Sequence, residues 1–313
     1  MGDMTMRDAY GEALMELVEE GMDLVAVHAD LSGADGTKKF DQTYPGRAVN
    51  VGVAEANMVG VAAGLSSRGK IPFADTFAVF ASRRVFDQFY ISANYARLNV
   101  KLTGSDPGIS AKFNGGTHMA FEDIAMMRTV PGLTVFEPCD TVSLKALVKA
   151  AARHEGCTYM RLHRKDPGVV YDASESFELG KGKILREGKD VTLIALGFIL
   201  VPRALEAAEL LAKEGIEATV IDMHTVKPID RDLVLEQAGK TGALVTMENH
   251  QIRGGLGSAV AEILAETGTG RLLRIGIDEE FGEVGRLPWL IERYGFTAEQ
   301  TAPRIKEFVG SLG

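Results

Sequence analysis

The segment Asn50–Met58, NVGVAEANM, sets Glu55 among small and apolar residues where a buried strand is expected to lead into a helix. Burial disfavours the charged form of a carboxylate, so Glu55 is expected to share a proton with a ligand, most simply with a heteroaromatic nitrogen. The same position also suits a helix-start glutamate that faces water and interacts with the helix dipole. Position alone leaves both interpretations open.

Outward from this segment, short apolar runs alternate with amphipathic stretches. The runs LVAVHA, IPFAD, LNVKLT, LTVFEP and TYMRLH are typical of buried strands, and helices are expected at residues 7–21, 55–69, 80–97, 121–129 and 142–154. Such an alternation predicts a mainly parallel sheet flanked by helices.

The composition changes between Asp166 and Lys183, where turn-forming and polar residues outnumber apolar ones. We therefore predict two α/β domains, at residues 1–170 and 185–313, joined by a linker at 171–184. In the second domain strands are expected at VTLIALG, ATVIDM and GALVTMEN, and helices at residues 202–214, 230–239 and 257–267.

Composition excludes several classes of function. A quarter of the 313 residues are charged and the net charge is −9, which argues against nucleic acid, whose binding requires a basic face. No apolar run approaches the roughly 20 residues of a membrane helix, and residues 1–20 do not resemble a signal peptide, so a cytoplasmic location is expected. Cys139 and Cys157 lack the spacing of a zinc site and are expected to be buried thiols.

Two further motifs place the glutamate in a family. TFAVF at residues 76–80 and GGTHMAFEDIAMMR at residues 115–128 follow it in order, between MRDAYGEAL at residues 6–14 and FGEVGRLPWLIERYGF at residues 281–296. This ordered set, which covers nearly the whole chain, resembles the C-terminal half of transketolase as found in enzymes split between two chains. The resemblance implies a pyrimidine-binding domain, a transketolase C-terminal domain and thiamine diphosphate as cofactor.

The resemblance also implies roles for residues around the cofactor. Glu55 matches the glutamate that hydrogen-bonds the aminopyrimidine nitrogen, and Phe80 matches the aromatic residue that stacks on this ring. Phe77 is expected either in the same wall or in ordinary core packing. His118, in GGTHM, matches a histidine over the thiazolium that contacts substrate oxygens, and an imidazole suits proton transfer near neutral pH. Asp30 matches a residue lining the cleft, or it caps the next helix as a turn residue.

Two arginines match positions that bind a substrate anion. Arg164 lies at the end of a predicted strand and Arg7 near the N-terminus, and a planar guanidinium suits phosphate, although either residue could be a surface charge.

The loop DPGISAKFNGG, residues 106–116, departs from the family pattern. Asp106 replaces a histidine, Asn114 replaces an aspartate, and Lys112 adds a cation. These changes predict a bulkier, more positive channel and altered sugar specificity, with ordinary, branched and sulfonated ketoses all compatible.

The Gly-Asp-Gly motif with its downstream asparagine, which holds the diphosphate through Mg²⁺ in thiamine enzymes, is missing from this sequence. GADG at residues 33–36 imitates it only in part, and GGLGSAVAE at residues 254–262 is not a full nucleotide-binding loop. We therefore expect a separate partner subunit to bind the diphosphate and Mg²⁺, in a dimer of such pairs, with self-association of this chain when it is isolated.

Two alternatives remain open at this point. The chain could be the beta subunit of a 2-oxo acid dehydrogenase, although that family generally lacks the GGTH loop followed by FEDIA. It could also be a catalytically silent regulatory subunit, which would have no physical need to keep Glu55, Phe80 and His118 together.

Overall fold

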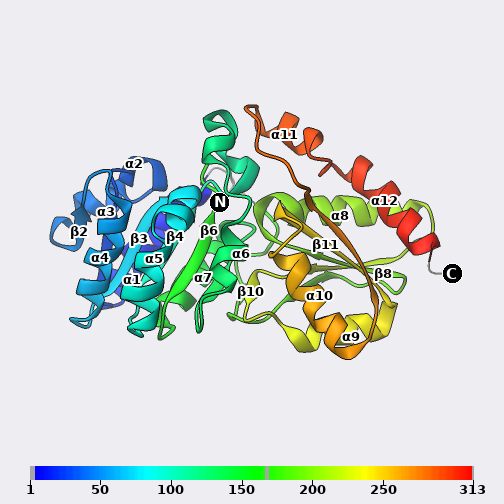
Figure 1. Ribbon diagram of the computed structural model, residues 1–313, viewed down its shortest axis with the longest axis horizontal. Coiled ribbons are helices and arrows are strands. Elements are labelled where there is room, and N and C mark those ends of the chain that lie inside the picture. Colours follow the sequence, from blue (N-terminus) through cyan, green and yellow to red (C-terminus); the bar gives the residue numbers. More distant parts are fainter. Residues whose placement is uncertain (1–3, 166–168, 312–313) are drawn as a thin grey trace.

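The computed structural model describes residues 4–165 and 169–311, which form two α/β domains side by side (Figure 1). The predicted fold class, two mainly parallel sheets flanked by helices, is confirmed. Positions 166–168, where the change in composition begins, lie outside the described residues.

The first sheet has seven strands within the described residues, in the order β10-β5-β6-β4-β3-β1-β2. All its neighbours pair in parallel except β10 with β5, which are antiparallel. The carboxyl ends of parallel strands meet at one edge, so this edge gathers the residues that follow β1, β3, β4 and β6. The strands are β1 (Leu24–His28), β2 (Ala48–Asn50), β3 (Ile71–Phe77), β4 (Lys101–Ser105), β5 (Thr134–Phe136), β6 (Thr158–Leu162) and β10 (Thr225–Lys227).

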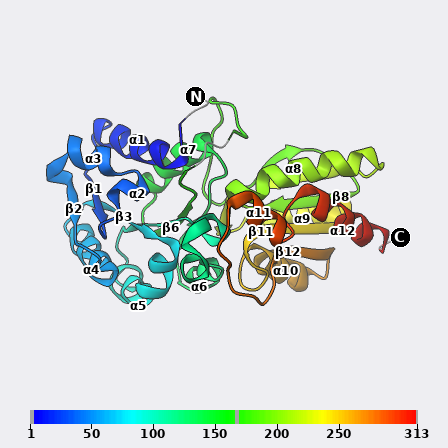
Figure 2. The same cartoon turned by 90° about the horizontal axis from the view of Figure 1, so that it is seen from above.

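Helices cover both faces of this sheet. Figure 2 shows α1 and α7 packed together on one face and α4, α5 and α6 on the other. The α-helices are α1 (Met6–Glu19), α2 (Ser32–Asp35), α3 (Lys38–Thr43), α4 (Glu55–Ser66), α5 (Phe86–Gln88), α6 (Asp123–Arg128) and α7 (Thr141–Arg153). Short 3₁₀ turns are η1 (Pro45–Arg47), η4 (Gly108–Asn114) and η5 (Gly116–His118), and π-helical turns are η2 (Phe80–Arg84) and η3 (Phe89–Tyr95).

The second sheet has the order β12-β11-β8-β9-β7 and is parallel except for β7. Helices α8 and α12 pack on one face, and α9 and α10 on the other (Figure 1). The strands are β7 (Lys183–Arg186), β8 (Val191–Ala195), β9 (Ala218–Asp222), β11 (Ala243–Gln251) and β12 (Arg271–Ile277). The helices are α8 (Gly197–Lys213), α9 (Arg231–Thr241), α10 (Leu256–Thr267), α11 (Leu287–Arg293) and α12 (Ala298–Gly310).

Several elements differ from the pattern read in the sequence. The helix expected at 80–97 is divided into η2, α5 and η3, and the helix expected from Pro202 begins at Gly197 with the proline inside it. Proline cannot donate to the carbonyl of Phe198, but the buried side chains Ile199, Leu200 and Val201 hold this first part against the sheet. Strand β7 begins at Lys183, within the predicted linker, whose boundaries stay a prediction.

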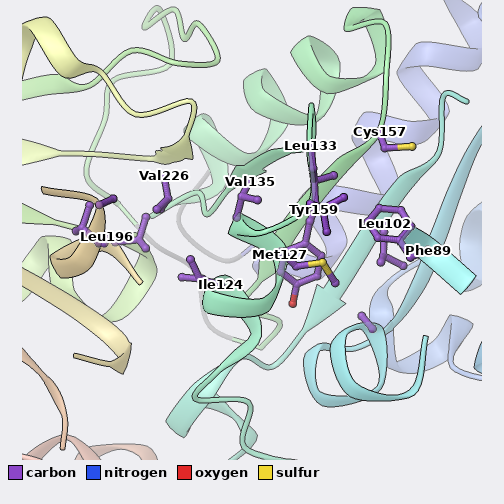
Figure 3. Packing of buried hydrophobic residues seen from close by; sticks show 14 of the residues in the cluster. Phe89, Leu102, Ile124, Met127, Leu133, Val135, Cys157, Tyr159, Leu196 and Val226 are labelled. Carbon is purple, nitrogen blue, oxygen red and sulfur yellow. The ribbon is translucent and has the colours of Figure 1, made fainter. Parts of the chain in front are cut away.

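One hydrophobic cluster continues from the first domain into the second. Figure 3 shows Tyr159, Val135 and Ile124 of the first domain in line with Val226 and Leu196 of the second. Both cysteines are buried and neither forms a disulfide. In the part of the chain that the structure describes, no helix combines the length and apolar character needed to cross a membrane.

Candidate active site

Glu55 is the first residue of α4, and its side chain is only 5 % exposed. The turn before it is fixed by Asn50, whose Oδ1 accepts the Gly52 N–H at 2.9 Å, and Gly52 adopts the positive φ of +72° that this turn requires. The Glu55 carboxylate therefore lies at the positive end of the helix dipole, inside the protein. Its Oε1 accepts a hydrogen bond from Arg84 Nη1 at 2.8 Å.

An aromatic wall lies near this carboxylate. Phe77 ends β3 and Phe80 begins η2, and their ring centroids are 6.0 Å apart. The His118 ring lies edge-on to both, with its centroid 5.4 Å from that of Phe80 and 6.2 Å from that of Phe77. The two phenylalanines pack against a small buried cluster behind them, formed by Ala78, Val79 and Ala120. Three sequence motifs that are distant along the chain therefore meet in one surface.

Two arginines lie at the far end of this wall. The Arg164 guanidinium carbon is 4.8 Å from the centroid of Phe77, and its Nη2 donates to Asp106. Arg164 Nη1 donates to the Ala34 carbonyl at 3.1 Å, and the Arg7 backbone N–H donates to the Arg164 carbonyl at 3.0 Å. The Arg7 side chain reaches the same segment, since its Nη1 donates to the Gly33 carbonyl at 3.5 Å, and it pairs with Asp8 at 4.0 Å. The two arginines, from opposite ends of the first domain's sequence, thus lie beside the same short turn, each next to a carboxylate.

The loop before His118 is tied to the second domain. Asn249 of β11 accepts the Ile109 N–H at 3.0 Å and donates to the Pro107 carbonyl at 3.0 Å. A side chain at Gly108, which has φ +55°, would meet Asn249 Oδ1 at 2.2 Å, so glycine is required there. The second domain therefore positions a loop of the candidate site.

The structure brings together seven of the residues singled out in the sequence: Glu55, Phe80, His118, Phe77, Arg164, Asp106 and Arg7.

The other residues singled out in the sequence lie in nearby loops. Asp30 is exposed after β1, with φ +60°, and its carboxylate accepts a hydrogen bond from Asn50 Nδ2 at 3.1 Å. Asn114 is exposed, and Lys112 is half-buried with φ +53°.

Sequence reasoning missed three residues. Arg84 contacts both Phe80 and Glu55, because its guanidinium carbon lies 3.7 Å from the Phe80 centroid while its Nη1 donates to Glu55. Asp35 and Asp75 are fully buried; burial raises the pKa of Asp35 to about 7 and that of Asp75 to about 8. Asp75 closes the strand-like run IPFAD, and an aspartate at such a position is the one signal that could have drawn attention to it.

The arrangement suits a long ligand with two unlike ends. A buried carboxylate beside a phenyl face can hold a planar heteroaromatic ring through an N–H or ring nitrogen, and paired arginines can hold an anion. His118 lies between these ends and can exchange a proton with a ligand oxygen. Among residues 4–165 and 169–311, no group of three or more His, Cys, Asp or Glu side chains is placed to hold a metal ion.

Both domains match models of known protein families. Residues 2–168 match the model of the transketolase pyrimidine binding domain, and residues 180–301 match that of the transketolase C-terminal domain.

Individual relatives match over nearly the full chain. A 6-deoxy-6-sulfo-D-fructose transketolase subunit from Clostridium sp. is 51 % identical over 94 % of this chain and 91 % of its own length. A putative transketolase C-terminal section from Methanocaldococcus jannaschii is 43 % identical over 96 % of this chain and 95 % of its own. A solved split gene transketolase, in an inactive beta4 tetramer, superposes with a TM-score of 0.90 at 45 % identity and covers 99 % of both chains.

Proposed function

Since the chain belongs to the transketolase family, we propose that it is the pyrimidine-binding subunit of a split transketolase that moves a two-carbon ketol unit from a ketose to an aldose. The observation that carries the proposal is the buried Glu55 carboxylate at one end of the Phe80–His118–Phe77 wall. A silent subunit would not need a buried carboxylate aligned with an aromatic wall and an imidazole.

The residues fit thiamine diphosphate, the cofactor of this family. When bound, this cofactor supplies a carbon that can become a carbanion and attack a carbonyl. Glu55 would hold a proton between its carboxylate and the aminopyrimidine nitrogen, where the low dielectric strengthens such a bond. Phe80 and Phe77 would orient the ring by their faces, and Asp30 would line the cleft.

His118 would exchange a proton with the substrate oxygen. Thr117 Oγ1 lies 2.9 Å from His118 Nδ1, so Nε2 is the nitrogen available for this transfer. Arg164 and Arg7 would bind the anionic end of the sugar, and Lys112 and Asn114 would contribute contacts from the loop.

The charge at the arginine end supports a proposal for the donor sugar. Asp106 pairs with Arg164 and Asp8 with Arg7, so the two guanidinium charges are largely balanced and the cluster offers a ligand little net positive charge. This suits a sulfonate, which carries one negative charge, better than a phosphate, which carries roughly −1.5 to −2 near pH 7. The relative that is 51 % identical is described as a 6-deoxy-6-sulfo-D-fructose transketolase subunit, and we propose a sulfonated ketose of this kind as donor.

We further propose that Mg²⁺ and the diphosphate are held by a partner subunit, in a heterotetramer made of two such pairs. One cofactor gripped by two chains is bound weakly by either alone, because each supplies only part of the contact. The beta4 tetramer of the split gene relative supports self-association when the partner is absent. The cytoplasmic location expected from the sequence stays a prediction.

The test combines calorimetry and turnover. Thiamine diphosphate with Mg²⁺ is titrated into this chain, into the partner, and into both together, and tight binding is expected only for the pair. Tight binding by this chain alone would contradict the split site. The pair is then assayed with 6-deoxy-6-sulfo-D-fructose, fructose 6-phosphate and xylulose 5-phosphate, where equal rates would remove the sulfonate preference. Reductive acylation of a lipoyl domain would instead indicate a 2-oxo acid dehydrogenase, and full turnover by Glu55→Ala would indicate a silent subunit.

A further inference from the structure

Arg84 occupies the space between Glu55 and Phe80. Its guanidinium lies over the Phe80 ring, with the central carbon 3.7 Å from the ring centroid, and its Nη1 donates to Glu55 Oε1 at 2.8 Å. Arg84 is itself 51 % exposed, whereas Glu55 is 5 % exposed. The buried carboxylate is therefore contacted by a guanidinium that is itself half-exposed to solvent.

Arg84 stacks on Phe80 and donates a hydrogen bond to Glu55. The proposed function gives the same two contacts to the aminopyrimidine. A guanidinium is flat, delocalised and carries N–H donors on its edge, so it can stack on a phenyl face and donate to a carboxylate at once. An aminopyrimidine ring has the same features. Resting on the proposed function, we infer that Arg84 holds the place of the cofactor's aminopyrimidine in the separate subunit and must leave it before the cofactor can bind.

The surroundings of Arg84 allow such a departure. It is the last residue of the π-helical turn η2, and its half-exposed side chain can rotate into water without opening the core. While Arg84 is in place it donates a hydrogen bond to the buried Glu55 carboxylate, so the subunit without cofactor does not bear the cost of a buried carboxylate that lacks a partner. Cofactor affinity is then reduced by the fraction of molecules in which Arg84 occupies the site.

Arg83 provides a matched control on the same turn. Its Nε lies 2.9 Å from Glu122 Oε1, and its side chain is 47 % exposed, so it resembles Arg84 in charge, ion pairing and exposure. It differs in pairing with a carboxylate other than Glu55. A general effect of surface charge on cofactor binding would therefore appear in Arg83→Met as well as in Arg84→Met.

The first experiment measures binding of thiamine diphosphate and of thiamine to the full chain alone by calorimetry. Arg84→Met is expected to bind both ligands about tenfold more tightly than the unmodified chain, since the competing group is gone. Arg83→Met is expected to match the unmodified chain for thiamine. If Arg84→Met binds no more tightly than the unmodified chain, including the case in which neither binds, the inference is overturned.

A double variant separates this inference from the proposed function. Adding Glu55→Gln to Arg84→Met should remove the gain in affinity, because the protein then no longer offers the Glu55 carboxylate to the ligand. If the double variant binds as tightly as Arg84→Met, Glu55 does not contact the ligand and the cofactor assignment fails. If Glu55→Gln weakens binding but Arg84→Met does not strengthen it, only the role of Arg84 fails.

A second readout follows Arg84 directly in the unmodified chain. Its Nε–H proton, identified by its loss in Arg84→Met, should resonate upfield because of the Phe80 ring current, and saturating thiamine diphosphate should abolish this shift. An Nε–H signal that keeps its upfield position in the saturated protein would show that Arg84 stays on Phe80, and would overturn the inference.

Discussion

Asp106 limits the positive charge that Arg164 can offer to a ligand, because its carboxylate pairs with the Arg164 guanidinium. Asp106→Asn keeps the shape of this side chain and removes the charge. We expect the ratio of kcat/KM for a phosphorylated ketose to that for a sulfonated ketose to rise about tenfold in the reconstituted enzyme, since a dianion gains more than a monoanion from the extra positive charge. An unchanged ratio would show that the substrate anion does not bind at this cluster.

Asp75 is fully buried, and its carboxylate accepts a hydrogen bond from the Tyr10 hydroxyl. Burial raises its pKa to about 8 from an ordinary value near 3.8, so the folded chain retains a proton that the unfolded chain loses. The contribution of Asp75 to the free energy of unfolding is therefore fully present below pH 4. It declines by up to about 1.4 kcal/mol per pH unit until about pH 8.

Urea unfolding at pH 5 and pH 8 measures this dependence. The free energy of unfolding should be lower at pH 8, and Asp75→Asn, which cannot ionise, should make the decrease smaller. Asp23→Asn is the control, because Asp23 is an exposed carboxylate paired with Lys70 and Arg47 and should leave the decrease unchanged. An equal decrease in all three proteins would mean that Asp75 does not titrate in this range.

At the scale of single residues, the sequence pointed to candidate site residues that stand in motifs, but it did not predict contacts that depend on how the chain folds. Glu55, Phe80 and His118 could be singled out because their motifs, taken in order along the chain, resemble one family. The adjacent residues Arg83 and Arg84 look alike in the sequence, yet one pairs with Glu122 and the other with Glu55. Their difference depends on which carboxylates the fold brings beside each side chain, since consecutive residues of a helical turn point in different directions.

At the scale of elements, the start of α7 is held by Asp140 in a capping box with Ser143. Asp140 Oδ1 accepts the Ser143 N–H at 2.7 Å, while Oδ2 accepts the N–H groups of Val170 and Tyr171 at 3.0 and 2.8 Å. One buried carboxylate therefore joins a helix of the first domain to the segment that leads to the second. No surface residue could replace these contacts.

Asp140→Ala should lower the free energy of unfolding by about 2–4 kcal/mol, because it removes a helix cap and leaves buried N–H groups without acceptors. Thr297→Ala, at the partly exposed cap of α12, should cost only about 1 kcal/mol. Equilibrium urea unfolding compares the two variants. Equal losses would indicate that the bonds to Val170 and Tyr171 contribute nothing beyond capping.

Element type was predictable where an amphipathic period was clear, as in α1 and α7, and where a short apolar run indicated a buried strand. Element type was not predictable between residues 80 and 97. An apolar pattern does not show whether each backbone N–H bonds to the carbonyl four residues earlier, as in an α-helix, or five residues earlier, as in a π turn. Strand β10 was missed because it is three residues long and pairs with β5 in the other domain, a contact that no local pattern encodes.

At the scale of the whole molecule, the two domains share structure on both sides of their boundary. Strand β10 of the second half extends the first sheet, and the core cluster continues from Val135 to Leu196 (Figure 3). Buried Arg161 pairs with Asp123 and Glu137 and donates to the Asn249 carbonyl at 2.9 Å. A division into two separate domains is a good prediction of topology but understates how firmly the site loop is fixed by the second half.

Asn249→Ala tests this link, because it removes both hydrogen bonds that hold Ile109 and Pro107. Each bond contributes about 1 kcal/mol, so amide hydrogen exchange in the loop at residues 108–118 should accelerate about tenfold or more while exchange in α8 stays unchanged. Asn94→Ala, which removes a side-chain bond to the Phe89 carbonyl, is the control and should leave this loop protected. Because His118 ends the loop, the reconstituted enzyme should also lose kcat through its misplacement. A loop that stays equally protected in Asn249→Ala would mean that the first domain alone positions His118, and that the second domain does not support the site.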